Sequence, residues 1–308
     1  MTSKKRNLIS IKDLSNEEIN LIFRSSEIHF SNNQNKLTKN NLSGKILINF
    51  FFENSTRTRT SFEIAAKNLG AEVVNIDISL SSLKKGESLI DTAKTINSMR
   101  PNFVAIRHNA SGIVNLLSNH IDSAVINAGD GTNEHPSQAL LDGFTIMQNK
   151  GRIKDLHISI CGDVLHSRVA RSNIILLSKL GAKINLITPP TLITPYFEEW
   201  VKNNWNIKVY QSLEDGIKNA DVIMMLRIQQ ERMLGCFIPS LSEYYKLFGM
   251  NHQKLSIAKK DVIVLHPGPI NREVEISSLL ADDKNFSLIL NQVESGVAVR
   301  QSILEFLS

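Results

Sequence analysis

The stretch Phe51–Glu63, FFENSTRTRTSFE, marks the point where a buried strand gives way to a helix. The apolar run 46–52 ends abruptly, and Ser55 then stands where a helix N-cap is expected. The sequence therefore predicts a strand, a short loop and a helix over 56–69. Its apolar residues recur with helical period up to the stop signal Gly70, namely Phe62, Ala65, Ala66 and Leu69.

The loop and first helical turn of this stretch are rich in groups that bind phosphate. Backbone N–H groups and the positive end of the helix dipole attract an anion to a helix N-terminus. Ser55, Thr56 and Thr58 add hydroxyl donors, and Arg57 adds a guanidinium. An ordinary capped helix would account for Ser55 alone, whereas three hydroxyls interleaved with two arginines exceed what capping needs. A phosphate site is therefore the favoured interpretation.

Seven segments of the chain resemble, in the same order, those of the aspartate and ornithine transcarbamylases. The first, FxExSTRTxxSFE, is similar to the carbamoyl phosphate signature of that family. The resemblance covers nearly the whole chain. The other six segments are SSLKKGESLIDT (81–92), AIRH (105–108), GDGTNEHPSQALLD (129–142), GDVLHSRVARSN (162–173), MLRIQQERM (225–233) and HPGPINREVEI (266–276).

Two short motifs indicate the second substrate. Ornithine enzymes typically carry HPCQ and HCLP, whereas HPSQ (135–138) and HPGP (266–269) of this chain look like the aspartate enzymes. Aspartate brings two carboxylates, and a planar guanidinium holds each of them best. Arg168 and Arg227 are the two candidates. An ornithine site would need an acceptor for the distant ammonium, and neither 266–269 nor 227–233 offers an obvious one.

The resemblance implies a carbamoyl phosphate site in which the first four residues hold the phosphate. Arg107 would reach both the phosphate and the carbonyl oxygen, and Thr58 and His135 would help to polarise the carbonyl. Gln138 and the backbone at 267–268 would accept hydrogen bonds from the carbamoyl NH2. The implied set is Ser55, Thr56, Arg57, Thr58, Ser81, Arg107, His135, Gln138, Pro267 and Gly268.

Several of these residues have ordinary alternatives. His135 alone would more often cap or pack at a helix start, and Arg107 alone would be a charged strand end. The motifs favour the functional interpretation of both. A neutral imidazole is favoured near a helix N-terminus, so we expect His135 to donate a hydrogen bond rather than act as an acid. The implied catalytic groups are Arg57, Thr58, Lys85, Arg107 and His135.

The resemblance also implies an aspartate site composed of Lys85, Arg168, Arg227 and Gln229. Adjacent lysines are usually solvated, but the family selects Lys85 and Ser81, in a loop that enters the active site of the neighbouring subunit of a trimer. Arg171 is an alternative to Arg168 as the substrate-binding arginine. The spacing in the family motif GDVLHSR favours Arg168, and Arg171 is then expected to be a structural ion-pair partner. For Gln229 the ordinary alternative is an exposed loop residue.

Alternating strand-like runs and helical periodicity predict an α/β protein with two doubly wound domains, each a parallel sheet flanked by helices. We expect a carbamoyl phosphate-binding domain over 1–149 and an aspartate-binding domain over 150–291. By resemblance, 292–308 returns as a helix to the first domain. Each motif follows a strand, and ligands bind outside the carboxyl ends of such strands, so the predicted site lies in the cleft between the domains.

Two local features stand apart. The segment 230–250 is rich in charge and aromatic residues without clear periodicity, and we interpret it as a loop that can serve as a lid. Glu273 stands where related chains often have glycine, so its backbone is expected to be less free to adopt a positive φ.

Composition limits the remaining possibilities. The 308 residues are 42% hydrophobic and 21% charged, as in soluble globular proteins. No apolar run approaches the roughly 18 residues that span a membrane, and the N-terminus lacks a signal-peptide core, so a cytoplasmic location is expected. The basic residues behind the net charge of +5 are scattered along the chain, which does not favour a nucleic-acid-binding role.

The cysteines and histidines do not indicate a metal site. Cys161 and Cys236 are expected to be free thiols, and neither they nor the histidines have metal-ligand spacing, so no metal or other cofactor is predicted.

The chemistry predicted from these residues is attack of the L-aspartate amine on carbamoyl phosphate, giving N-carbamoyl-L-aspartate and phosphate in pyrimidine biosynthesis. No motif side chain is an evident nucleophile beside a base, so catalysis would rest on orientation and electrostatics. The alternatives are a transcarbamylase for another amino acid such as ornithine, and an inactive scaffold, which would have lost catalytic positions. The implied assembly is a homotrimer with shared active sites, with a regulatory chain or a dihydroorotase as possible partners.

Overall fold

The computed structural model describes residues 6–77, 86–233, 235 and 237–308. The chain forms two compact units. The first holds the chain up to Phe144 and again from Val293, and the second holds Thr145–Gln292. The predicted division of 1–149 and 150–291 into carbamoyl phosphate-binding and aspartate-binding domains stays a prediction. Among the described residues, no helix combines the length and apolar composition that crossing a bilayer requires.

The first unit contains a four-stranded sheet in the order β2-β1-β3-β4, with every pairing parallel. β1 pairs with both β2 and β3, so the chain first builds the sheet on one side of β1 and then continues on the other. The carboxyl ends of β1 and β3 therefore form the switch point of a doubly wound sheet. The strands are β1 (Ile46–Phe51), β2 (Glu72–Asp77), β3 (Phe103–His108) and β4 (Ala124–Asp130).

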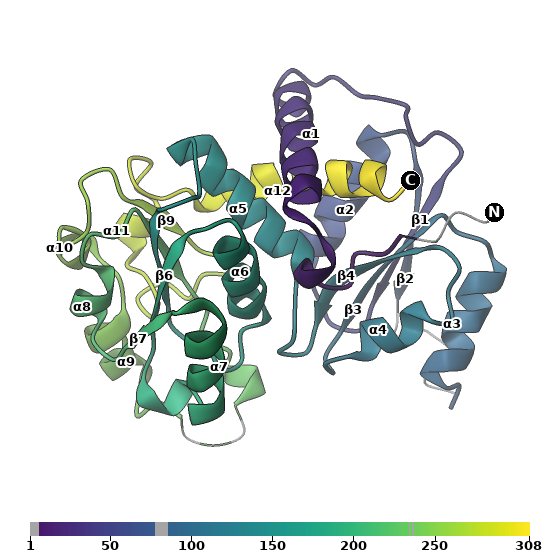
Figure 1. Ribbon diagram of the computed structural model, residues 1–308. Helices are drawn as coiled ribbons and strands as arrows, with labels where there is room; N and C mark the ends of the chain where they lie inside the picture. The colour runs from purple at the N-terminus through teal and green to yellow at the C-terminus, as the bar shows by residue number, and fades with distance from the viewer. Residues whose placement is uncertain (1–5, 78–85, 234, 236) are drawn as a thin grey trace. The chain divides into compact units, whose positions relative to one another are not determined.

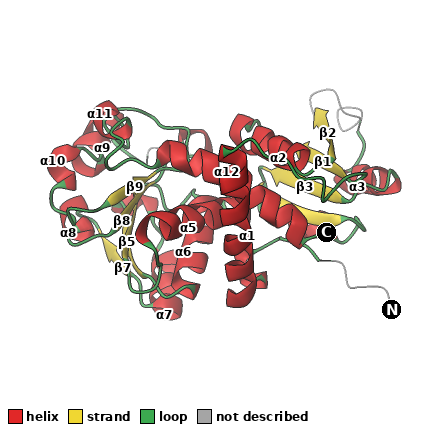
Figure 2. Ribbon diagram, turned by 90° about the horizontal axis from the view of Figure 1, so that it is seen from above, coloured by secondary structure: helices red, strands yellow, loops and turns green. Residues whose placement is uncertain are grey.

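Helices flank this sheet on both faces (Figures 1 and 2). Ile48 and Phe50 of β1 join residues of α3 and α4 in one buried cluster, so these two helices cover the same face. All four apolar residues predicted for the buried side of α2 are buried. The helices that connect the strands are α2 (Thr56–Asn68), α3 (Leu89–Ser98) and α4 (Ile113–Ser118).

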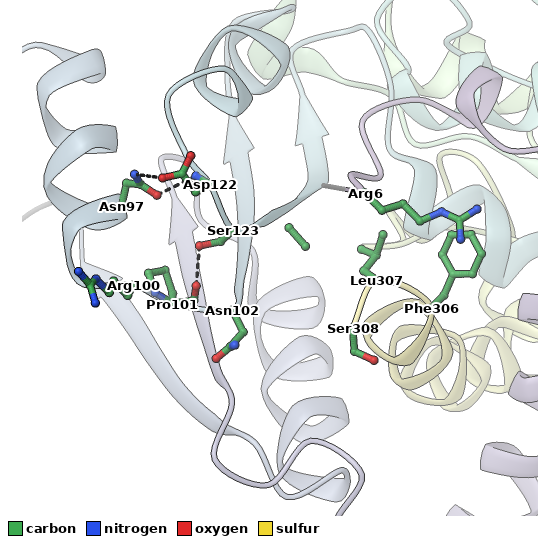
Figure 3. A pocket seen from close by; sticks show the side chains of 11 residues that line it. Arg6, Asn97, Arg100, Pro101, Asn102, Asp122, Ser123, Phe306, Leu307 and Ser308 are labelled. Carbon is green, nitrogen blue, oxygen red and sulfur yellow. Dashed lines mark hydrogen bonds between the residues drawn. The ribbon is translucent and has the colours of Figure 1, made fainter. Parts of the chain in front are cut away.

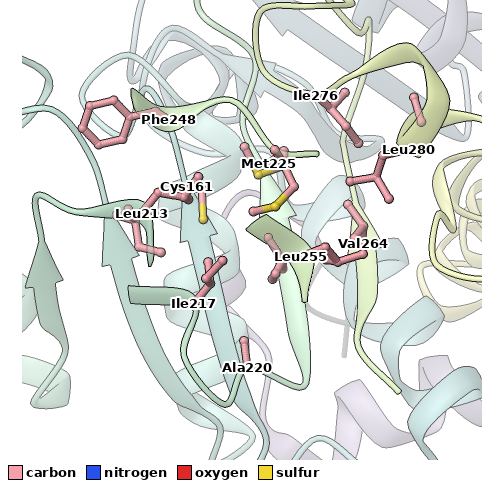
Figure 4. Close-up of a cluster of buried hydrophobic side chains, with 14 of the residues drawn as sticks. Cys161, Leu213, Ile217, Ala220, Met225, Phe248, Leu255, Val264, Ile276 and Leu280 are labelled. Carbon is pink, nitrogen blue, oxygen red and sulfur yellow. The ribbon is translucent and has the colours of Figure 1, made fainter. Parts of the chain in front are cut away.

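The second unit contains a five-stranded parallel sheet in the order β7-β6-β5-β8-β9, whose switch point lies between β5 and β8. Cys161 of β5 and Met225 of β8 are buried in a cluster that fills one side of the sheet (Figure 4). Cys161 is a free thiol, as predicted, and Cys236 lies outside the described residues. The strands are β5 (His157–Cys161), β6 (Lys183–Ile187), β7 (Lys208–Tyr210), β8 (Val222–Met225) and β9 (Ile263–Leu265).

The remaining helices complete both units. α5 and α12 each cross the sequence boundary between the units. The short helices are η1 (Ile11–Asp13), η4 (Pro190–Leu192) and η5 (Gln230–Arg232). The others are α1 (Asn16–Gln34), α5 (Pro136–Lys150), α6 (Arg168–Lys179), α7 (Pro195–Trp205), α8 (Leu213–Ile217), α9 (Leu241–Phe248), α10 (His252–Leu255), α11 (Ser278–Ala281) and α12 (Ile289–Phe306).

The C-terminal helix α12 returns to the first unit and packs against α1, which confirms the predicted fold class. Glu305 of α12 contacts His29 of α1 (Nε2 to Oε2, 2.7 Å) and accepts a hydrogen bond from Asn41 (2.6 Å). The predicted helices do not include α1. Its start carries a capping box between Ser15 and Glu18, a signal that the alternating pattern beginning at residue 45 obscured.

The structure corrects one local expectation and bears on a second. The segment 230–250 is not all loop, because Ser240 caps the helix α9 and Tyr244 and Phe248 are buried on one side of it. Glu273 does adopt a positive φ, of 59°. Its Oε1 accepts a hydrogen bond from Ser278 N (2.6 Å) at the start of α11, which helps to hold this backbone conformation.

Replacing Glu305 with Gln should destabilise the first unit at neutral pH. Hydrogen bonding to His29 lowers the pKa of Glu305. A carboxyl whose folded-state pKa is lowered stabilises the fold above its unfolded pKa, and this stability is lost as the pH falls through the folded value. We expect the free energy of unfolding in urea to fall by about 1 kcal/mol at pH 7, after allowance for partial exposure.

The difference between wild type and variant should begin to shrink near the ordinary glutamate pKa of about 4.3 and should vanish only when the pH lies below the lowered folded-state pKa. Glu294→Gln is the matched control, because Glu294 also lies on α12 and accepts an exposed hydrogen bond from Gln34 (3.2 Å). A loss of stability that stayed the same from pH 7 down to about pH 2 would contradict this account of the helix contact.

Candidate functional site

The predicted phosphate-binding residues lie at the switch point of the first unit, where α2 begins. Ser55 is the N-cap of α2, as predicted, but its hydroxyl makes no capping hydrogen bond. Thr56 and Arg57 are exposed in the first turn, whereas Thr58 is buried. The N-terminus of α2 thus presents its N–H groups without the usual side-chain acceptor, as an anion site requires.

Arg107 links the ends of three neighbouring strands. It lies near the carboxyl end of β3, and its Nε donates to Oε2 of Glu53 (3.1 Å), in the loop that follows β1. Its Nη1 approaches the carbonyl of Ala128 on β4 (3.4 Å). Arg107 and Glu53 are largely buried, so the ion pair fixes the guanidinium at the edge of the sheet where Ser55 lies.

His135 and Gln138 lie at the start of α5, close to the carboxyl end of β4. His135 is buried, immediately precedes the helix, and its carbonyl accepts from Gln138 N (3.0 Å). Its Nδ1 lies 3.5 Å from Oγ of Ser137. The Gln138 Nε2 donates to Oδ1 of Asp142 one turn later (2.9 Å). The first unit therefore gathers residues 55–58, 107, 135 and 138 at the carboxyl ends of adjacent parallel strands.

Arg168 and Arg227 follow the two switch-point strands of the second unit. Arg168 is the first residue of α6, after β5, and is 3% exposed. Arg227 follows β8, and its Nη2 donates to Oε2 of Glu231 (3.0 Å), in an ion pair that also involves Nη1. The Gln229 Oε1 lies 3.3 Å from Nη1 of Arg227. Arg227 and Gln229 are half-buried, so solvent or a ligand can reach them.

Two buried carboxylates hold the backbone beside Arg227 in place. Oδ2 of Asp163 accepts from Gln229 N (3.2 Å), and Oε1 of Glu275 accepts from Ile228 N (2.9 Å). Both carboxylates are fully buried. Because a buried carboxylate accepting N–H bonds strongly favours one geometry, the position of Arg227 is fixed before any ligand binds.

Pro267 and Gly268 follow β9 in the second unit and are half-buried. The Gly268 N–H donates to Nδ1 of His266 (2.9 Å), which leaves the carbonyls of this segment as acceptors for another group. The predicted residues Ser81 and Lys85 lie outside the described residues. In the part of the chain that the structure describes, no group of three or more His, Cys, Asp or Glu side chains is arranged to hold a metal ion.

A cavity of about 810 Å3 opens elsewhere in the first unit (Figure 3). It is lined by Asn97 and Asp122, which pair with each other, and by Arg100, Phe306 and Ser308. These residues precede β3 and β4 or end α12, so the cavity lies at the amino ends of the strands and shares no residue with the predicted site.

Four carboxylates that hold the site arginines or the backbone beside Arg227 are missing from the residues predicted from the sequence. Each lies inside one of the seven segments, so the motifs contained a signal for them, but sequence reasoning selected only groups that would touch a substrate. These residues are Glu53, Asp163, Glu231 and Glu275.

Two family models match the chain. One describes the carbamoyl-P binding domain of aspartate/ornithine carbamoyltransferases over residues 6–148, and the other describes their Asp/Orn binding domain over residues 154–307. The chain belongs to the aspartate/ornithine carbamoyltransferase family. Membership confirms the family resemblance that the seven segments predicted.

Individual carbamoyltransferases match over nearly their full length. An aspartate carbamoyltransferase catalytic subunit from Ruegeria pomeroyi is 52% identical over 309 residues, covering 100% of this chain and 98% of the relative. Aspartate transcarbamoylase from Trypanosoma cruzi, solved with carbamoyl phosphate and aspartate, superposes with a TM-score of 0.89 at 27% identity, covering 98% of this chain and 96% of that one. Ornithine carbamoyltransferase from Pyrococcus furiosus gives a TM-score of 0.87 at 27% identity, with coverage of 98% and 96%. The fold alone therefore does not select the amino acid.

Replacing Ser55 with Ala should separate ligand binding from helix stability. Because the Ser55 hydroxyl makes no cap bond, we expect the free energy of unfolding to change by less than about 0.5 kcal/mol, well below the ~1 kcal/mol typical of an N-cap. If Ser55 binds phosphate, as the sequence predicts, affinity for carbamoyl phosphate should fall about tenfold through the loss of one donor to a phosphate oxygen.

Ser15→Ala is the control for this experiment. The Ser15 hydroxyl caps α1 by accepting from Glu18 N (3.2 Å), so its loss should lower stability without changing ligand affinity. If Ser55→Ala were as destabilising as Ser15→Ala and bound carbamoyl phosphate normally, Ser55 would be an ordinary cap.

Proposed function

We infer that this chain transfers the carbamoyl group of carbamoyl phosphate to the amine of L-aspartate, giving N-carbamoyl-L-aspartate and phosphate. The observation that carries this inference is full-length identity of 52% with a protein named aspartate carbamoyltransferase catalytic subunit. HPSQ and HPGP, in place of the ornithine motifs, agree with it. The chain is therefore a carbamoyl-group transferase.

The residues of the first unit account for the carbamoyl phosphate end of the reaction. The exposed N-terminus of α2, with Ser55, Thr56, Arg57 and Thr58, would hold the phosphate. Arg107 would span phosphate and carbonyl oxygen. Its pairing with Glu53 supports this role, because a guanidinium held in place is ready to stabilise charge that develops on the oxygen. His135, buried near the same edge of the sheet, would add a neutral donor, and Gln138 would accept from the carbamoyl NH2.

The residues of the second unit account for the amino acid. Arg168 and Arg227 would each bind one carboxylate of aspartate, with Gln229 and Lys85 beside them. Two guanidiniums suit the two carboxylates of aspartate, whereas ornithine offers only one carboxylate to the pair. The carbonyls near Pro267 and Gly268 would accept from the carbamoyl NH2 together with Gln138.

The reaction then needs no covalent enzyme intermediate and no cofactor. The aspartate nitrogen forms a bond to the carbamoyl carbon, the C–O bond to phosphate breaks, and the bonding pair leaves with the phosphate. The departing phosphate takes the proton that the amine loses. Thr58, Arg107 and His135 would stabilise the negative charge on the carbonyl oxygen between these two events.

The working assembly would be a homotrimer in the cytoplasm, acting in pyrimidine biosynthesis. Ser81 and Lys85 would reach the site of the neighbouring subunit, so each site would combine Arg57 of one chain with Lys85 of the next. The possible further partners are a regulatory chain and a dihydroorotase.

The inferred activity predicts that the purified protein carbamoylates L-aspartate and not L-ornithine. Steady-state release of phosphate from carbamoyl phosphate, followed with each amino acid in turn, measures this directly. Equal or greater turnover with ornithine would overturn the assignment, and no turnover with any amine would favour the inactive scaffold.

Arg227→Ala should raise KM for aspartate and lower kcat while leaving carbamoyl phosphate affinity nearly unchanged. Removing a charged contact at a buried pair typically costs about 3–5 kcal/mol. Arg272→Ala is the control, because Arg272 pairs with Asp282 (2.7 Å) in the same unit but outside the predicted site. Loss of carbamoyl phosphate binding in Arg227→Ala, measured by calorimetry, would show that Arg227 does not serve aspartate.

Mixing two inactive variants tests the shared site. If Arg57→Ala and Lys85→Ala chains exchange freely in a one-to-one mixture, random assembly gives about one quarter of the interfaces both native residues. Activity near that fraction of wild type is expected. A mixture that stayed inactive after mass spectrometry had verified exchange would show that each chain supplies its own Lys85.

A further inference from the structure

The side-chain amide of Gln138 can adopt two orientations, and the surrounding residues favour one of them. Its side-chain amide carries a donor, Nε2, and an acceptor, Oε1, of nearly equal shape, and only one orientation presents an acceptor to a substrate amine. Nε2 donates to Oδ1 of Asp142 at 2.9 Å. An ionised carboxylate can only accept hydrogen bonds, so it selects the orientation in which Nε2 faces Asp142 and Oε1 lies on the opposite side of the amide.

This selection requires Asp142 to be ionised although it is fully buried. Burial alone favours the neutral acid, which would donate a hydrogen bond and permit the reverse orientation of Gln138. An opposite charge nearby favours the ionised form instead. The Arg300 guanidinium on α12 is 3% exposed and interacts electrostatically with Asp142. Burial lowers the pKa of Arg300 to about 10, so the group is still charged at neutral pH.

Neutral groups hold Arg300 in its place. Its Nη1 donates to Oγ of Ser61 on α2 (3.0 Å) and to the carbonyl of Gly296 (3.0 Å), and its guanidinium carbon lies 5.1 Å from the ring centre of Phe62. Neither acceptor is charged, so neither neutralises the cation. A cation held this way keeps its electrostatic effect on a carboxylate nearby.

The close approach of three helices makes this arrangement possible. A Cβ added at Gly296 would lie 2.7 Å from Nη1 of Arg300, 3.2 Å from Cδ2 of Leu141 on α5 and 3.7 Å from Oγ of Ser61 on α2. Helix α12 therefore passes against both helices at this point (Figure 1), and the glycine leaves the room that the guanidinium fills. The C-terminal helix α12 thus places the positive charge of Arg300 beside α5, the helix that carries Gln138.

We propose that Asp142 is a positioning residue for the carbamoyl amide: it fixes Gln138 with Oε1 towards the substrate NH2, and Arg300 keeps Asp142 ionised. This proposal rests on the proposed function, because it concerns how that same site recognises its carbamoyl group. It also explains why a buried charge is placed one helical turn beyond Gln138, where an apolar residue would otherwise pack well.

Asp142→Asn tests the proposal, because asparagine keeps the volume but offers both a donor and an acceptor to Gln138. The probes are carbamoyl phosphate and acetyl phosphate, which has a methyl group in place of the NH2. We expect the KM for carbamoyl phosphate to rise about tenfold, while the inhibition constant of acetyl phosphate stays within about twofold of wild type. Asp122→Asn is the control, since Asp122 accepts from an amide, Nδ2 of Asn97 (2.9 Å), in the same unit but away from the site.

A double variant that exchanges the amide and the carboxylate between positions 138 and 142 provides a second, independent test. When Gln138→Glu is combined with Asp142→Asn, the introduced asparagine amide can donate to the introduced carboxylate, whose other oxygen again presents an acceptor. This double variant should keep the preference for carbamoyl over acetyl phosphate within about threefold of wild type, whereas Gln138→Glu alone places two carboxylates together and should lose it.

Equal weakening of both phosphates in Asp142→Asn, or loss of the preference in the double variant, would overturn the proposal and leave Asp142 a merely structural residue. Failure of the proposed function is distinguished from this result by the wild-type protein. If wild type does not carbamoylate aspartate, the function is wrong; if it does and Asp142→Asn keeps the preference, only the positioning role is wrong.

Discussion

The parallel pairing of β1 with both β2 and β3, and of β5 with both β6 and β8, is the constraint on which the candidate site depends. At each of these switch points the chain leaves the two neighbouring strands towards opposite faces of the sheet, which opens space at their carboxyl ends. Ser55 and Arg107 lie at the first point, and Arg168 and Arg227 lie at the second. The hydrogen-bond ladders thus decide where cations gather, because they bring loops far apart in sequence to one edge of each sheet.

Gathering cations in half-buried positions creates an electrostatic cost that neighbouring carboxylates offset. Glu53 beside Arg107 and Glu231 beside Arg227 each accept hydrogen bonds from the guanidinium and so hold it in one orientation. The same pairing limits affinity, because an incoming anion finds each arginine already partly neutralised. Fixed geometry is what the carboxylates contribute in return, and preorganised charge is more effective in a transition state than charge that must first be oriented.

Most of the fold could be predicted because apolar runs and helical periodicity reflect burial directly. The strand Ile46–Phe51 and the buried side of α2 were both evident from the sequence. Helix α9 was not, since only Tyr244 and Phe248 of its eight residues are buried and the pattern is too short to show a period. Supporting residues such as Glu53 were missed for a different reason: they lie inside the matched segments, but their role depends on a contact with an arginine of another strand, which sequence spacing does not reveal.

The N-caps of the helices show one place where the chain lacks a stabilising hydrogen bond at a helix start. Among the described helices that have Ser, Thr or Asn at the N-cap, α2 alone lacks a hydrogen bond from that side chain to the helix backbone. A missing cap typically costs about 1 kcal/mol. At those other helix starts the N-cap side chain accepts a hydrogen bond from the helix backbone. At the start of α2, next to Arg57, it does not, and a bound anion would instead accept from the open N–H groups. Departures from local rules concentrate at functional sites, so this exception is independent physical support for phosphate binding at the start of α2.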